Sequence, residues 1–71
     1  MVNANKLRAK MVEVGLNVET TAEKAGISKA TLYRRLNNPE EITIGEADKL
    51  VSALALSCAD AVAIFFSQIV A

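Results

Sequence analysis

The sequence contains no histidine, a single cysteine, a single proline and only 4% aromatic residues. Without histidine or a cysteine cluster, it offers no ligand set for a zinc ion, and the lone thiol of Cys58 cannot form a disulfide within the chain. A glycine-rich phosphate loop is also missing, as is any nucleophile beside a plausible base. These absences argue against an enzyme, and no cofactor or metal is expected.

Long apolar runs are absent as well, since no stretch approaches the ~20 residues of a membrane span. The first ten residues carry charges, but no apolar segment follows them, so no secretory signal is predicted. With one cysteine and no export signal, a reducing cytoplasm is the expected compartment. The chain is 71 residues long and 52% hydrophobic, so we expect one all-α domain over residues 1–71, with a core of Ala, Val, Leu and Ile.

The formal net charge is zero, but the charges are unevenly distributed. Residues 1–10 contain three cations and no acid, and residues 28–37 contain Lys29, Arg34 and Arg35 and no acid. The chain from residue 38 onward is predominantly acidic. Binding to phosphates requires a basic face rather than a basic total, so both segments qualify. For each, the alternative is an ordinary solvated surface, which we favour for Lys6, Arg8 and Lys10.

Five helices and no strands are predicted from apolar periodicity and from capping residues. Thr20 and Glu23 have the spacing of a capping box for the second helix, as have Thr43 and Glu46 for the fourth. The expected ranges are about 3–14, with an apolar stripe of Leu7, Met11 and Val14; 20–25; 29–37, capped by Ser28; 43–54, with Ala47, Leu50, Val51 and Leu54 inside; and 58–71. The expected fold is a compact five-helix bundle.

The segment Val18–Asn37 has the sequence features of a helix-turn-helix. Ala22 is small enough for a second helix to cross closely, and Gly26 stands four residues later, where the turn needs a positive φ. Ile27 and Leu32 would anchor the second helix in the core. This spacing, within helices two and three of five, resembles the lambda-repressor-like (Xre/Cro-type) helix-turn-helix family. Val18 departs from the family pattern, in which glutamine often holds a phosphate at this position.

The resemblance implies that the helix at about 29–37 enters the major groove of double-stranded DNA. The residues that it implies as base readers are Ser28, Lys29, Ala30, Tyr33 and Arg34. Arginine and lysine can donate to guanine, and the Ala30 methyl can contact thymine. The residues placed toward phosphates are Thr31, Arg35, Asn37 and Asn38, together with the backbone amides near Thr20 and Thr21 at the start of the second helix. For Tyr33 the alternative is packing over the edge of the core. Leu36 is expected to face inward and Arg35 to lie at the rim.

The predicted fifth helix is more apolar than a monomer of this size needs. Cys58, Val62, Phe65, Phe66 and Ile69 fall on its inner side, with Val70 adjoining and Ile64 on the outer side. Of the two phenylalanines, one is expected to face the core and the other its edge. We expect a homodimer through residues 58–71, with an interface drawn from Ile64, Phe65, Phe66, Ile69 and Val70. The alternatives are that this helix packs internally or meets another protein. Cys58 is expected to be a small buried residue.

The leading hypothesis is a sequence-specific transcriptional regulator of the small phage-repressor or Cro type, acting in the cytoplasm of a bacterial or phage-infected cell on a DNA operator. The alternative is a protein-interaction module, such as an antirepressor or an antitoxin-like subunit, which uses the same fold without reading DNA. The zero net charge, Val18 and the apolar fifth helix favour the alternative. A regulatory protein partner is a further candidate.

Overall fold

The computed structural model describes residues 2–67, and within that range the chain is all-helical. Its elements, in chain order, are α1 (Ala4–Glu13), α2 (Val18–Ala25), α3 (Lys29–Asn37), a single 3₁₀ turn η1 (Pro39–Glu41), α4 (Ile44–Leu54) and α5 (Cys58–Phe65). The predicted five-helix fold is therefore confirmed. None of the helices in residues 2–67 combines the length and apolar character required to span a bilayer.

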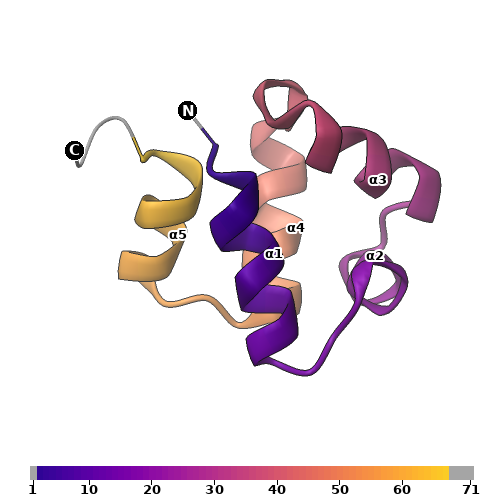
Figure 1. Ribbon diagram of the computed structural model, residues 1–71, viewed down its shortest axis with the longest axis horizontal. Coiled ribbons are helices and arrows are strands. Elements are labelled where there is room, and N and C mark those ends of the chain that lie inside the picture. Colours follow the sequence, from indigo (N-terminus) through magenta and orange to yellow (C-terminus); the bar gives the residue numbers. More distant parts are fainter. Residues whose placement is uncertain (1, 68–71) are drawn as a thin grey trace.

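The core is aliphatic, as the composition predicts. It consists of Leu7 and Met11 of α1, Ala22 and Ala25 of α2, Leu32 and Leu36 of α3, Leu50 and Leu54 of α4, and Ile64 and Phe65 of α5. Helix α2 packs on both α3 and α4, whereas α1 packs on α5. In Figure 1, the α2–α3 unit and α5 lie at opposite ends of the long axis, with α1 and α4 between them. The face of α3 that does not enter the core is left to solvent.

Most helix boundaries follow from the capping residues that the sequence displays. Ser28 caps α3, and its side chain accepts a hydrogen bond from the amide of Thr31. Thr43 and Glu46 form the predicted capping box of α4. Ser57 caps α5 by accepting from the amide of Asp60. Pro39 begins the η1 turn, where its fixed φ and missing N–H prevent α3 from continuing.

The start of the second helix was predicted one turn too late. Asn17, rather than Thr20, caps α2, and the reciprocal capping box joins the side chains and amides of Asn17 and Thr20. Asparagine is as good a cap as threonine, and it precedes the third helical residue by the spacing that a capping box needs. Thr21 therefore lies within the helix, and it is completely buried. The amides of Thr20 and Thr21, expected to hold a phosphate, donate instead to Asn17, to its Oδ1 at 2.8 Å and to its carbonyl at 2.9 Å, and the buried Thr21 side chain does not reach the surface.

The inner face of α5 also differs from the prediction. Ile64, expected on the outer side, is buried, and Cys58, expected to be buried, is exposed. The helix ends at Phe65, and its inner stripe consists of Ala61, Ile64 and Phe65, of which only Phe65 was expected on the inner side. Phe65 faces the core and Phe66 is 52% exposed, which confirms that the two phenylalanines diverge. Residues 68–71, which include the predicted interface residues Ile69 and Val70, lie outside the described range.

Helix α1 ends one residue earlier than its apolar pattern suggested. It ends at Glu13, and Val14 forms its C-cap, so Val14 is 41% exposed although Leu7 and Met11 are buried. Gly15 follows with φ +77°, the left-handed conformation that glycine adopts at little cost. The chain then turns toward α2, so Val14 lies outside the apolar stripe.

We expect Thr21→Val to stabilise the protein. The Oγ1 atom of Thr21 is buried and has no hydrogen-bond partner among residues 2–67. Valine has nearly the same shape without the unsatisfied hydroxyl, so the free energy of unfolding should rise by about 1 kcal/mol, measured by urea denaturation. The matched control is Thr20→Val, which removes the 2.9 Å hydrogen bond from the Asn17 amide to Thr20 Oγ1 and should destabilise by about 0.5–1 kcal/mol. A loss of stability in Thr21→Val would show that the hydroxyl is satisfied.

Candidate DNA-binding surface

The outward face of α3 is fixed by the two leucines on its inner face. Leu32 and Leu36 are 0% and 4% exposed, one helical turn apart, and they hold α3 against the rest of the core. Helical geometry then places the intervening positions on the opposite side. The exposed residues are Ser28, Lys29, Ala30, Tyr33, Arg34, Asn37 and Asn38. All five predicted base readers are therefore accessible, four of them on α3 and Ser28 as its cap.

The turn before α3 determines how this face is presented. Gly26 has φ +70° and ψ +30°, and its amide bonds to carbonyls in the last turn of α2. The amide of Ile27 bonds to the carbonyl of Ala22 at 3.0 Å, which completes the C-terminal cap of the helix. Ala22 is 1% exposed at the crossing of α2, and Ile27 packs on the core. The four positions that define the predicted helix-turn-helix thus have the predicted structural roles.

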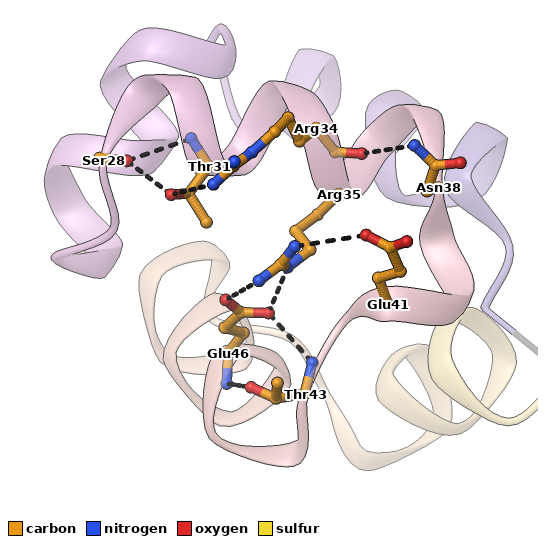
Figure 2. Close-up of polar contacts among 8 residues, drawn as sticks. All are labelled: Ser28, Thr31, Arg34, Arg35, Asn38, Glu41, Thr43 and Glu46. Carbon is orange, nitrogen blue, oxygen red and sulfur yellow. Dashed lines mark hydrogen bonds and ion pairs between the residues drawn. The ribbon is translucent and has the colours of Figure 1, made fainter.

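A chain of polar contacts runs along the first two turns of α3 (Figure 2). The Ser28 hydroxyl donates to Thr31 Oγ1 at 2.7 Å, and Arg34 Nη2 donates to the same oxygen at 3.3 Å. The Arg34 side chain therefore lies back along the helix toward its N-terminal half. Within residues 2–67, no carboxylate forms an ion pair with Arg34. Its guanidinium is therefore an exposed, uncompensated charge beside Thr31.

Lys29 is the second exposed cation on this face. Its ammonium lies 3.4 Å from a carboxylate oxygen of Glu19 on α2, and both side chains are 60% exposed. A surface pair of this kind is weak and easily exchanged for another anion. Lys29 therefore remains free to bind a phosphate or a base edge, although Glu19 lowers the local positive potential.

Arg35, predicted to lie toward phosphates, is instead directed at α4. Its Nε donates to Glu46 Oε1 at 2.8 Å, its Nη2 donates to Glu46 Oε2 at 3.2 Å, and its Nη1 lies 3.6 Å from Glu41 (Figure 2). The side chains of Arg35 and Glu46 are 21% and 17% exposed. Sequence analysis missed this pair, although the opposite charges of Arg35 and Glu46 stand on consecutive helices.

The other predicted phosphate contacts have mixed placements. Thr20 is exposed at the start of α2, and Asn37 and Asn38 are exposed at the end of α3, while Thr31 is half-buried and bonded to Ser28. The Asn38 side chain donates to the carbonyl of Arg34 at 3.5 Å. Lys10 of α1 is held by Asp60 at 3.0 Å and by Glu13 at 3.3 Å, so it is not a free cation.

The contacts of Glu46 shift its protonation equilibrium. The hydrogen bonds from Arg35, and to a smaller degree the amide of Thr43, lower the pKa of Glu46 below its ordinary value of 4.5, although partial burial opposes them. The same contact raises the pKa of Arg35, which is a cation at any ordinary pH. Since the folded-state pKa of Glu46 is depressed, the stability it contributes is complete above about pH 4.5 and is lost as the pH falls through the lowered value.

We expect Glu46→Gln to reduce the acid sensitivity of the fold. The wild-type protein should lose stability between pH 6 and pH 3, and the variant should lose less over this interval because it lacks the titrating carboxylate. The measurement is the urea midpoint at both pH values. Glu40→Gln is the control, since Glu40 is exposed and makes no ion pair within residues 2–67. An equal loss in wild type and Glu46→Gln would show that the pair does not stabilise the fold.

Comparison with known proteins agrees with the geometry of this surface. The family model described as helix-turn-helix matches residues 7–60, which is most of the chain and includes α2, the Gly26 turn and α3. Searches of curated proteins and of solved structures gave no match. The matched range runs from the first core residue of α1 to the first turn of α5, so it covers the elements that hold α3 in place. The chain belongs to the lambda-repressor-like (Xre-type) helix-turn-helix family of DNA-binding regulators.

Proposed function

We propose that this protein is a sequence-specific transcriptional regulator of the small repressor or Cro type, and that it reads the major groove with α3. The observation that carries the proposal is that Ser28, Lys29, Ala30, Tyr33 and Arg34 are all exposed at α3, while two buried leucines anchor this helix in the core. The first turns of the helix present hydrogen-bond donors from Lys29 and Arg34, a methyl group from Ala30 and a phenol from Tyr33. These are the groups that distinguish base pairs in the major groove.

The proposed roles divide the surface into readers and positioning contacts. The residues proposed to contact base edges are Ser28, Lys29, Ala30, Tyr33 and Arg34. Those proposed to contact the phosphate backbone of DNA are Thr20, Thr31, Asn37 and Asn38. The position of Asn17 as the cap of α2 moves the expected phosphate contact toward the first turn of that helix. Glu19 in the same turn weakens this phosphate contact, because its carboxylate would repel a phosphate.

The proposal includes no catalytic step and places the protein in the cytoplasm of a bacterial or phage-infected cell.

Few cations of α3 are available to DNA, since Arg35 is paired with Glu46 and only Lys29 and Arg34 are exposed. Each phosphate that a protein cation neutralises contributes about −0.9 to the slope of the logarithm of the binding constant K against the logarithm of the salt concentration. We therefore infer modest affinity for one protomer, which favours binding as a pair of copies.

We propose that two copies associate through an apolar patch defined by Ile44, Phe66 and the groove between them. Ile44 is 89% exposed and Phe66 is 52% exposed. The groove has a volume of about 90 Å³ and no charged residue in its lining, which consists of Val2, Ile42, Thr43, Ile44, Ala47, Phe65 and Phe66. An uncharged apolar surface does not repel its own copy across a two-fold axis. Because Ile64 and Phe65 are buried in the core, the patch differs from the helix-5 surface expected from the sequence.

The acidic residues around α3 and the apolar patch favour a second candidate function, a protein-interaction module that does not read DNA. Glu19 beside Lys29, and Glu46 and Glu41 beside Arg35, reduce the positive charge near α3. The Ile44–Phe66 patch would then meet a different protein. The two functions differ in which surface is essential, so variants of α3 and of the patch distinguish them.

We expect Arg34→Ala to lower the affinity for a specific duplex by about 1–3 kcal/mol, because a bidentate contact to guanine is lost. The measurement is a titration in a mobility-shift or fluorescence-anisotropy assay at several salt concentrations. Arg8→Ala is the matched control, since Arg8 is an exposed arginine on α1. Binding that is unaffected by Arg34→Ala, or that stays constant from low to high salt, would favour the interaction module.

We expect Ile44→Glu and Phe66→Ser to shift the protein toward the monomer, because each replaces an exposed apolar side chain at the centre of the patch. Sedimentation velocity measures the change, and circular dichroism checks that the helices remain. Val12→Glu is the control, since Val12 is 76% exposed on α1 and lies outside the groove. A monomeric wild type at high concentration, or equal dissociation in the control, would contradict a dimer through this patch.

A further inference from the structure

One bidentate ion pair connects α3 directly to α4. Helix α3 packs mainly against α2 and η1, while α4 packs against α2, so α3 and α4 are joined largely through their neighbours. Arg35 spans this gap. Its Nε and Nη2 atoms reach the two carboxylate oxygens of Glu46 at 2.8 and 3.2 Å. A planar guanidinium facing a carboxylate in this manner fixes both distance and angle.

Glu46 is held in place independently of Arg35. Its backbone amide donates to Thr43 Oγ1 at 3.1 Å, and its carboxylate accepts from the Thr43 amide at 3.0 Å. The capping box therefore sets the direction of the carboxylate within the first turn of α4. In Figure 2, the same Glu46 oxygen receives one dashed line from Thr43 and one from Arg35. The helix cap and the ion pair are thus one connected unit.

The two neighbouring arginines of α3 consequently point in different directions. Arg34 lies along the helix beside Thr31, on the face with the predicted readers, whereas Arg35 reaches across to α4 (Figure 2). Glu46, with Glu41 at 3.6 Å, compensates the charge of Arg35. A guanidinium with two carboxylate neighbours is poorly suited to hold a phosphate, because the phosphate would be repelled by the same carboxylates.

We propose that Arg35 and Glu46 are a positioning pair, which sets the orientation of α3 on α4 and so determines how the residues around Arg34 meet the bases. The proposal rests on the proposed function and changes the role of Arg35 from the phosphate contact expected from the sequence. The pair acts through geometry: it does not touch DNA, but it holds the C-terminal half of α3 at a fixed angle. Loss of either member allows α3 to rotate or tilt about its leucine anchors.

The positioning role and a phosphate contact make opposite predictions for Glu46→Gln. If Arg35 held a phosphate, removing the competing carboxylate would leave binding unchanged or make it tighter. If the pair positions α3, the neutral amide loses the charge-assisted fork, and affinity for the specific duplex falls. Arg35→Lys is equally informative, because lysine keeps the charge for a phosphate but not the planar fork for Glu46.

The test uses the full chain and two duplexes, one selected from random sequences with the wild-type protein and one unrelated. We expect Arg35→Met, Arg35→Lys and Glu46→Gln each to weaken binding of the selected duplex by about three- to tenfold, with little change for the unrelated duplex. The slope of log K against log salt should remain that of the wild type, because no phosphate contact is removed. Glu41→Gln is the matched control and should bind normally, since it removes the same charge from the more distant and more exposed neighbour of Arg35.

The overturning result is also specific. Unchanged or tighter binding in Glu46→Gln, together with a salt slope reduced by about 1 in Arg35→Met, would make Arg35 a phosphate contact. Failure of the proposed function appears earlier and differently, as a wild-type protein that enriches no duplex. Urea denaturation of each variant at pH 7 confirms that the protein tested is folded, and Glu46→Gln alone decides the question if Arg35→Met does not fold.

Discussion

The burial of Leu32 and Leu36 is the constraint on which the rest of the structure depends. Helices of eight to eleven residues are too short to be stable alone, so each must be held by its neighbours. The two leucines hold α3 in the aliphatic core, and the Gly26 turn sets where α3 begins. Once these are fixed, the outward face of α3 is fixed as well. The surface chemistry of the protein is therefore a consequence of its core packing.

Charge has a different role in this molecule from the one that a simple count suggests. The net charge is zero, and the ion pairs join elements: Lys10 with Asp60 links α1 to α5, and Arg35 with Glu46 links α3 to α4. Of the exposed cations on α3, Arg34 makes no ion pair within residues 2–67, and Lys29 makes only a solvent-exposed one with Glu19. A small domain can thus keep its net charge near zero and still present a locally basic helix to an anionic partner.

Much of the fold could be predicted because its signals are local. Ser28, Gly26 and the Thr43–Glu46 box act within one turn, and their roles were read correctly from spacing alone. The errors arose where a choice depended on packing. Asn17 and Thr20 are both good caps, and Val18, the first residue of α2, packs against the core. The inner face of α5 depended on where the helix ends, and the partner of Arg35 depended on how α3 meets α4.

The central claim is that α3 reads a DNA sequence, and selection of binding sites from random duplexes tests it most directly. We expect enrichment of a short consensus, repeated as two inverted half-sites about one helical turn apart if two copies bind together. A consensus without inverted repeats would retain the reading role and remove the dimer. The absence of any enrichment would contradict the claim and leave the Ile44–Phe66 patch as the functional surface.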